Sequence, residues 1–146
     1  MTREIEFRGF GGTKWYYGDL EYNRKTGVAR IHTYEEDGSY CRQYTVDPDT
    51  VGQFTGMRDK NGRKIYEGDV VRRKDSAYEL EDTGVVKFCC SLGAFVIESE
   101  YRGRTYRAVF KKGFSDNEGK YTIEGTYSYE LLGNIYDNPQ FLDKKE

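Results

Sequence analysis

The chain is organised around residues 51–71, which read VGQFTGMRDKNGRKIYEGDVV. Residues 59–62, Asp-Lys-Asn-Gly, predict a tight turn, because an Asn-Gly pair readily adopts the positive φ angles that hairpin turns require. The segments on either side, residues 54–57 and 64–66, are therefore expected to pair as a short hairpin. Glu67-Gly68-Asp69 predicts a second turn, directly before a new strand. These signals specify an architecture and carry no chemistry.

The composition predicts an all-β, antiparallel fold. Charged residues make up 33% of the 146 residues, and the mean hydropathy of −0.88 would by itself suggest disorder. Fourteen tyrosines, eight phenylalanines and one tryptophan argue against disorder, because a solvated coil contains few aromatic side chains. Aromatic residues fit a pleated, half-buried surface, and seventeen glycines supply turns. The length suits one domain, or two very small ones that share a core.

The first half of the chain predicts a four-stranded antiparallel meander. Strands are expected at about residues 3–8, 14–22, 28–34 and 39–46. Gly9, Gly11 and Gly12 are expected to end the first strand, and Asp37-Gly38 suits a type I′ turn between the last two. Asp47 is expected to cap a single helical turn that begins at Pro48.

The second half predicts further antiparallel strands that are joined by two polar loops. Strands are expected at residues 70–73, 84–90, 94–99, 105–111, 121–127 and 129–135, and the polar loops at residues 74–83 and 113–120. A turn near Arg102-Gly103 connects two of these strands. Phe141 and Leu142 are expected to dock in a terminal turn.

Several short motifs are spread along the chain. The central ones are residues 51–56, 59–62 and 65–70, and others lie at residues 7–9, 15–20 and 133–139. Their structural positions are Trp15, Gly18, Asp19, Gly52, Gly56, Asn61, Gly62, Tyr66, Gly68, Asp69, Gly133 and Asn134. Together they closely resemble the signature of the YopX family of phage and prophage proteins. The resemblance implies a phage or prophage origin and a shared fold, and it implies no particular biochemical activity.

The expected layout is a single YopX-like domain over residues 1–146. Its parts are an N-terminal half at about residues 1–50, a central hairpin at 51–68 and a C-terminal half at 69–142. Tyr17-Gly18-Asp19-Leu20 and Tyr66-Glu67-Gly68-Asp69-Val70 share a pattern of tyrosine, Gly-Asp turn and apolar strand. Such a turn is common where a small SH3-like barrel begins, and the resemblance implies the same architecture. We therefore expect SH3-like barrel or roll units with minimal helix.

The charge and the cysteine content restrict the class of protein and its location. The net charge of −2 excludes a globally basic protein that coats nucleic acid, although it leaves room for a local basic patch. Three cysteines do not make a disulfide framework. The sequence shows no signal peptide and no apolar run of about 18 residues, so we expect a protein that is neither secreted nor membrane-spanning. The reducing cytoplasm of a bacterial host is the expected location.

Groups that could carry catalysis or hold a metal are sparse. His32, the single histidine, has no nucleophile-elbow or cysteine-protease signature near it, so an ordinary strand histidine is the favoured interpretation. Cys41 and the adjacent Cys89 and Cys90 lack the spacing of zinc ligands. Residues 9–12 lack the lysine and the helix of a phosphate loop. We predict no catalytic residue, no metal, no other cofactor and no small-molecule substrate.

The carboxylates are interpreted mainly as solvated or structural groups. Clusters such as Glu35-Glu36-Asp37 lie in predicted turns and loops, where solvated charge is the default. Asp19 and Asp69 match the family motif, and each is expected to close its turn by accepting hydrogen bonds from backbone amides. A catalytic role for this pair is the alternative interpretation.

Basic residues interleave with aromatic residues in the second half of the chain. Lys and Arg could follow phosphates on such strands while tyrosines stack on bases. The seven basic residues are Arg72, Arg73, Arg102, Arg104, Arg107, Lys111 and Lys112. The competing interpretation is a solvated strand face whose arginines cover the edges of the aromatic core.

The excess of tyrosine is also typical of protein-binding surfaces. Edge strands of short antiparallel sheets could in addition be closed by pairing between subunits. We therefore predict a non-enzymatic binding protein that forms a homo-oligomer or clamps a phage or host protein. A nucleic-acid-binding β module that uses the seven basic residues is the alternative, and no membrane partner is expected.

Overall fold

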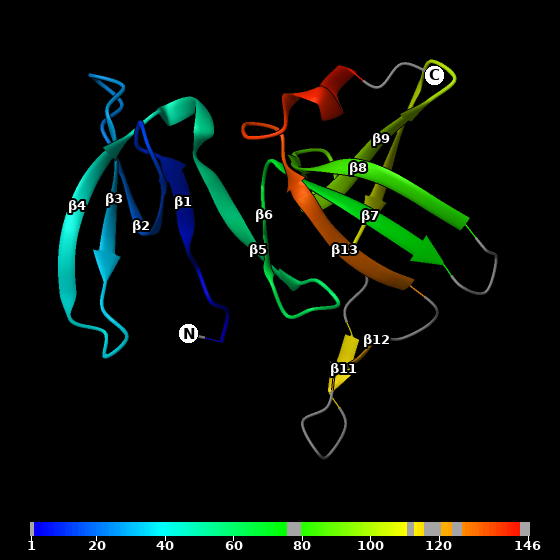
Figure 1. The fold of residues 1–146 in the computed structure, drawn as a ribbon, viewed down its shortest axis with the longest axis horizontal. Coiled ribbons are helices and arrows are strands. Elements are labelled where there is room, and N and C mark those ends of the chain that lie inside the picture. The colour runs from blue at the N-terminus through cyan, green and yellow to red at the C-terminus, as the bar shows by residue number, and fades with distance from the viewer. Residues whose placement is uncertain (1, 76–79, 111–112, 116–120, 124–126, 144–146) are drawn as a thin grey trace. The chain divides into compact units, whose positions relative to one another are not determined.

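The computed structural model describes residues 2–75, 80–110, 113–115, 121–123 and 127–143. The described residues form antiparallel β strands and two short 3-10 helices, which confirms the all-β, antiparallel prediction (Figure 1). The chain divides into two compact units, Met1–Gly56 and Met57–Glu146. The strand β5 (Gly52–Arg58) crosses this division, so the predicted central hairpin starts in the first unit and ends in the second.

The first unit is a curled antiparallel sheet. Its strands are β1 (Phe7–Phe10), β2 (Trp15–Tyr22), β3 (Ala29–Tyr34) and β4 (Tyr40–Val46), and β5 pairs with the free side of β1. The order β4-β3-β2-β1-β5 confirms the predicted meander. Ala29, Ile31 and Val46 form the buried core of this unit, because alternate residues of each strand face inward.

Gly9 lies inside the first strand and does not end it. A Cβ atom at Gly9 would lie 2.6 Å from the Val46 Cγ2 atom, so only glycine lets β4 approach β1 this closely. The Asp47 N–H donates to the Phe10 carbonyl at 2.9 Å at the same place. The prediction of a strand at residues 3–8 that ends at Gly9 was therefore wrong, because the glycine serves close packing and not chain reversal.

The predicted helical turn after the meander is confirmed. The helix η1 spans Pro48–Thr50, and the Asp47 side chain accepts a hydrogen bond from the Asp49 N–H at 3.0 Å. The Thr50 hydroxyl accepts a hydrogen bond from the Phe10 N–H at 2.9 Å. The cap therefore fixes the end of β1 as well as the start of the helix.

The glycine turns differ in type from the prediction. Gly38 and Gly62 have φ angles of +86° and +81°, but the residue before each has a negative φ, so neither Asp37-Gly38 nor Asn61-Gly62 is a type I′ turn. Both loops have three residues and place glycine last, as in a type I turn followed by a left-handed residue. Consecutive positive φ angles, as in a type I′ turn, occur instead at Arg102 (50°) and Gly103 (73°).

The second unit contains a five-stranded antiparallel sheet with the order β10-β9-β8-β7-β13. The strands are β7 (Asp69–Asp75), β8 (Leu80–Cys89), β9 (Ala94–Tyr101), β10 (Arg104–Val109) and β13 (Tyr127–Asn134). The short strand β6 (Lys64–Tyr66) closes the hairpin that β5 begins. Ile65, Val71, Val86, Ile97 and Tyr129 form the buried core of this unit.

Two segments that were predicted to be loops contain β-strand residues. β7 and β8 extend into the predicted loop 74–83, because opposite charges face each other across the strands, as in the pair of Arg73 and Asp82 at 3.0 Å. Residues 76–79 lie outside the described residues. In the predicted loop 113–120, Gly113–Ser115 form β11, which pairs with β12 (Tyr121–Ile123).

The sheets are open and do not close into the predicted SH3-like barrels. In the second unit the outer edge of β13 is covered by the hairpin turn and not by β10. The Lys60 N–H donates to the Tyr129 carbonyl at 2.9 Å, and the Arg63 guanidinium donates to the Leu131 carbonyl at 3.0 Å. Because these backbone groups already have partners, the edge is satisfied without barrel closure.

Two smaller predictions were also wrong. Gly18-Asp19 lies within β2 and forms no turn, so the echo between this segment and Tyr66–Val70 does not extend to structure. The terminal helix η2 (Pro139–Asp143) forms, and Phe141 is half-buried, but Leu142 remains 60% exposed and does not dock. Within the described part of the chain, no helix has the length and apolar character needed to span a membrane.

Candidate functional site

The motif residues of the second unit hold turns together. The Asp69 side chain is buried, and it accepts a hydrogen bond from the Tyr66 N–H at 2.7 Å across the second turn. Gly68, between them, has a φ of +87°. The Asn134 side chain accepts hydrogen bonds from the backbone N–H groups of Tyr136 at 2.9 Å and Asp137 at 2.8 Å. These residues position strands β7 and β13 and leave no reactive group exposed.

Asp19, the other carboxylate of the predicted pair, has a different role. It is exposed on β2, where it accepts a hydrogen bond from the Tyr34 hydroxyl at 2.8 Å. Asp19 belongs to the first unit and Asp69 to the second. The two carboxylates therefore have separate local partners, one on a surface and one in a turn.

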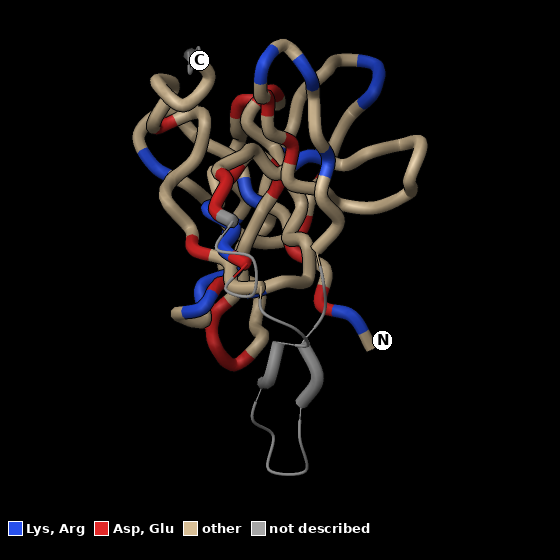
Figure 2. Tube along the Cα trace, turned by 90° about the vertical axis from the view of Figure 1, so that its right-hand side faces the viewer, with Lys and Arg blue, Asp and Glu red and all other residues tan. Residues whose placement is uncertain are grey.

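The predicted basic residues are largely paired with acidic ones. Arg72 lies 3.0 Å from Glu81, Arg73 lies 3.0 Å from Asp82, and Arg107 lies 3.0 Å from Glu98. Arg72 and Arg73 are consecutive on β7, so they project from opposite faces of the sheet. Figure 2 shows basic and acidic residues interspersed along the trace.

The remaining basic residues lie at the hairpin between β9 and β10 or beyond the described residues. Arg102 lies in the turn, Arg104 follows it, and both are exposed; the Arg102 guanidinium lies 5.2 Å from the centre of the Tyr101 ring. Lys111 and Lys112 fall outside the described residues. The structure therefore does not gather the predicted set into one basic patch among the residues that it describes.

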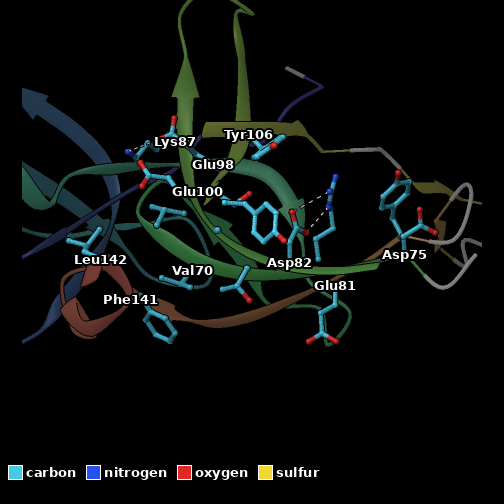
Figure 3. A pocket seen from close by; sticks show the side chains of 17 residues that line it. Val70, Asp75, Glu81, Asp82, Lys87, Glu98, Glu100, Tyr106, Phe141 and Leu142 are labelled. Atoms are coloured by element: carbon cyan, nitrogen blue, oxygen red, sulfur yellow. Dashed lines mark hydrogen bonds and ion pairs between the residues drawn. The ribbon is translucent and has the colours of Figure 1, made fainter. Parts of the chain in front are cut away.

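The second unit contains a hollow of about 900 Å³ that strands β7–β10 and helix η2 line (Figure 3). On one side, Arg73 donates two hydrogen bonds to Asp82, at 3.0 and 3.3 Å, and its guanidinium lies 5.4 Å from the centre of the Tyr127 ring. On the other side, Lys87 donates to Glu98 at 2.8 Å. Arg73, Asp82, Lys87 and Glu98 are thus engaged with one another in pairs.

The electrostatics of this hollow favour ionised carboxylates. The hydrogen bond from Lys87 is the main reason that the pKa of Glu98 lies below its usual value, and the Arg107 guanidinium lowers it further against the opposing effect of burial. Glu98 therefore remains ionised at neutral pH and is unsuited to act as a general acid. Among the described residues, no group of three potential metal ligands is found.

The outer face of strands β2, β3 and β4 in the first unit is the second candidate surface, here called the tyrosine face. Its members project away from the core because they alternate with the inward-facing residues of each strand. They are Tyr17, Asp19, Glu21, Arg30, His32, Tyr34 and Tyr40. The three tyrosines are 45%, 47% and 55% exposed, which is high for such large apolar rings.

Hydrogen bonds and ring contacts hold the tyrosine face in one conformation. The Tyr34 hydroxyl binds Asp19, and the Tyr40 hydroxyl lies 3.3 Å from the His32 Nδ1 atom. The Tyr34 and Tyr40 rings meet edge to face with centroids 5.8 Å apart. The opposite His32 nitrogen lies 3.7 Å from the Glu21 carboxylate. The Tyr34 and Tyr40 side chains therefore each have a hydrogen-bond partner on the same face.

The sequence does not predict the tyrosine face as a cluster. By its sequence, His32 is an isolated strand histidine, and Tyr34 and Tyr40 only add to the tyrosine content. The available signal was the alternation Arg30, His32, Tyr34 against Ala29 and Ile31, which assigns the polar and aromatic residues to one outer face. The strand register, which the sequence did not provide, brings Asp19 opposite His32.

Comparisons with known proteins give a family and a fold. The family model described as YopX protein matches residues 6–143. The crystal structure of protein YopX from Bacillus subtilis has a TM-score of 0.51 and 18% identity, over 92% of this chain and 95% of that one. The crystal structure of protein EF1440 from Enterococcus faecalis has a TM-score of 0.44 and 17% identity, over 97% and 99% of the two chains. At 18% identity, the similarity to the Bacillus subtilis structure bears on the fold alone. No curated protein matches the chain.

Proposed function

The chain belongs to the YopX protein family, and from that starting point we propose that it is a non-enzymatic binding protein that assembles with a second copy of itself through the tyrosine face. As part of this proposal, the protein has an accessory role in a phage or prophage, the origin that the sequence resemblance implies, and acts in the cytoplasm of a bacterial host. The observation that carries the proposal is the ordered group of exposed tyrosines on β2, β3 and β4. Three free cysteines among the described residues fit a reducing compartment.

The fixed positions of the Tyr34 and Tyr40 side chains support a binding role. Side chains that are fixed before association lose less conformational entropy when a partner covers them. Tyr34 and Tyr40 are held by Asp19 and His32, so their rings can supply buried contact area at low entropic cost. Tyrosine is also among the residues that contribute most to binding energy at interfaces.

The charges of the tyrosine face support a second copy as the partner. Glu21 on β2 lies opposite Arg30 on β3, 3.2 Å from it, and Asp19 lies two residues away on β2, so the face carries both signs side by side. A twofold interface requires a surface that is complementary to itself, and such a mixed face meets this requirement. Strand β4 is the sheet edge next to this face, and its residues Tyr40–Gln43 are exposed and contain Arg42 as their one charged residue.

Sedimentation equilibrium at micromolar concentration tests the proposal. The wild-type protein is expected to sediment as a dimer or larger closed oligomer, and the double variant Tyr34→Ser/Tyr40→Ser as a monomer. Tyr106→Ser is the matched control, since Tyr106 is 48% exposed on β10 in the other unit and should not change the mass. A monomeric wild-type protein, or a double variant with the wild-type mass, would reject the tyrosine face as a self-association surface.

One observation favours nucleic-acid binding as the second candidate function. At the hairpin between β9 and β10, Arg102 lies over the Tyr101 ring, and the nearby Tyr106 ring is exposed. This combination resembles the stacking platforms that bind single strands. Fluorescence anisotropy with labelled single-stranded DNA, duplex DNA and RNA at about 50 and about 200 mM salt tests it, because phosphate contacts weaken steeply with salt. Binding that Arg102→Ala/Arg104→Ala abolishes would support this function, and no binding at low salt would exclude it.

A further inference from the structure

Strand β10 (Arg104–Val109) is an open edge of the sheet in the second unit. It is the outermost strand of the order β10-β9-β8-β7-β13, and its pairing with β9 runs without a register shift from Arg104 to Val109. At the opposite edge, the Lys60 N–H and the Arg63 guanidinium donate to carbonyl groups of β13. Among the described residues, none bonds to the outer side of β10 in this way. The chain therefore covers one edge of this sheet and leaves the other open.

The turn between β9 and β10 determines which backbone groups of β10 are open. The loop has two residues, both with positive φ angles. In such a hairpin the closing pair, here Tyr101 and Arg104, exchanges both backbone hydrogen bonds, and every second pair along the strands does the same. The N–H and C=O groups of Thr105, Arg107 and Val109 lie between these pairs and point away from β9. These groups are thus available to an added strand.

The side chains of β10 leave the edge accessible. Tyr106 is 48% exposed and Val109 is 50% exposed, and they lie on opposite faces of the strand. Proline and β-bulges commonly block an edge. β10 contains no proline, and its ladder with β9, all of whose residues are described, has no bulge. A strand added here would cover Tyr106 on one face and Val109 on the other, so the edge offers apolar contact as well as backbone hydrogen bonds.

One face of the hairpin carries a positive charge that no neighbouring carboxylate balances. Glu98 lies opposite Arg107, binds Lys87 as well, and shares its face with Glu100. Arg104 belongs to the other face, on which neither β9 nor β10, both fully described, has an acidic residue. Arg104 is exposed and forms no ion pair with another described residue. Its guanidinium is therefore available beside the open backbone groups.

We propose that the edge of β10 is a docking site for an extended acidic segment of a partner protein, which adds a strand to this sheet. The open backbone groups of Thr105, Arg107 and Val109 form the new ladder, and an acidic side chain of the segment pairs with Arg104. A second copy of β10 is a poor occupant, because the two strands would bring four arginines together. Nucleic acid has no peptide groups to continue the ladder. The site lies in the second unit and is independent of the tyrosine face.

Fluorescence anisotropy with the full chain and a labelled synthetic peptide tests the proposal. The probe is a peptide of about eight residues in which glutamate alternates with valine, so that all its carboxylates share one face of a strand. It is expected to bind with a Kd below about 100 μM at about 50 mM salt. Two control peptides should bind at least about tenfold more weakly. One has lysine in place of glutamate, and the other has every backbone amide N-methylated.

Thr105→Pro tests the edge from the side of the protein. The Thr105 N–H points away from β9, so proline removes an open donor and leaves the ladder with β9 intact. This change should weaken binding of the glutamate peptide at least about tenfold, whereas the matched control Thr105→Val keeps the N–H and the wild-type affinity. Arg104→Gln should weaken binding about two- to fivefold, as expected for one exposed ion pair.

Two results would overturn the proposal. One is the absence of binding by the glutamate peptide at about 100 μM, the limit set above for added-strand docking. The other is binding that survives N-methylation of the peptide, which would show charge attraction without a ladder. If circular dichroism shows that Thr105→Pro does not fold, the N-methylated peptide on the wild-type protein decides. Binding of labelled single-stranded DNA without binding of the peptide would assign this surface to nucleic acid instead.

Discussion

The Asp59 carboxylate accepts a hydrogen bond from the Leu131 N–H at 3.1 Å, across 72 positions of the chain. The same buried side chain accepts bonds from the backbone N–H groups of Asn61 and Arg63, each at 2.9 Å, and from the Arg63 guanidinium at 3.0 Å. One carboxylate therefore closes the hairpin turn and attaches it to the edge of β13. The turn at the centre of the sequence is in this way a tertiary contact of the second unit.

Asp59→Ala is expected to destabilise the second unit by about 2 to 3 kcal/mol, because the Leu131 N–H loses its partner at a partly buried position. Urea unfolding followed by tyrosine fluorescence measures the change. Asp37→Ala is the matched control, since Asp37 accepts from the Ser39 N–H at 2.9 Å in an exposed turn. An equal effect of the two substitutions would show that the hydrogen bond from Leu131 contributes nothing to the free energy of unfolding.

The contribution of Asp59 is expected to depend on pH. Burial would raise the pKa of Asp59, but hydrogen bonds from Leu131, Arg63 and Asn61 outweigh burial and hold it below the usual 3.8. A carboxyl whose pKa is lower in the folded state stabilises the fold fully above its unfolded pKa and loses this effect as pH falls. The difference in unfolding free energy between wild type and Asp59→Asn should be constant above about pH 5 and shrink as pH falls below about 4. A difference that grows on acidification would contradict this account.

Gly68→Val is expected to unfold or aggregate the protein. The φ of +87° already disfavours a β-branched residue, and a Cβ atom would lie 2.8 Å from the Tyr136 Cε2 atom. Gly62→Val is the control, because Gly62 has a φ of +81° with open space around it. Thermal melts should show a larger loss for Gly68→Val than for Gly62→Val by about 1 to 3 kcal/mol. Similar losses of stability in the two variants would mean that the positive φ angle alone explains why position 68 requires glycine.

Gly9→Ala is expected to cost about 1 to 3 kcal/mol, because the added methyl group would overlap Val46 between β1 and β4. Val46→Ala removes the closest of the overlapping atoms, although it leaves a cavity of its own. The double variant should therefore be more stable than the sum of the two single changes predicts, by about 1 kcal/mol. If the two changes in unfolding free energy are additive in urea unfolding, contact with Val46 is not the reason that position 9 requires glycine.

The Tyr34 hydroxyl is expected to ionise above its usual pKa of 10.0, chiefly because it donates to the Asp19 carboxylate, whose charge also opposes a phenolate. Asp19→Asn should return the pKa of Tyr34 toward 10.0, as followed by NMR of ring-labelled tyrosine. An unchanged Tyr34 titration in Asp19→Asn would mean that the hydrogen bond is absent in solution.

The strands β2, β3 and β4 and the helical turn η1 of the first unit could be predicted because their causes are local. Asp47 caps η1 through an amide two residues away, and the alternation around Ile31 assigns a face to each residue of β3. The strands of the predicted loop 74–83 could not be found in this way. Their residues are polar and lack alternation, and they form strand because Arg73 on β7 meets Asp82 on β8.

The all-β class, the antiparallel meander and the positions of most turns follow from local signals, since backbone preferences and residue alternation act within a few positions. Only the folded chain shows that Gly9 is a packing site, that Asp59 binds Leu131 and that the sheets remain open. The same holds for the side chains that meet on the tyrosine face. The physical reason is that these contacts depend on strand register and on the close approach of distant backbones, and no local signal encodes either of them.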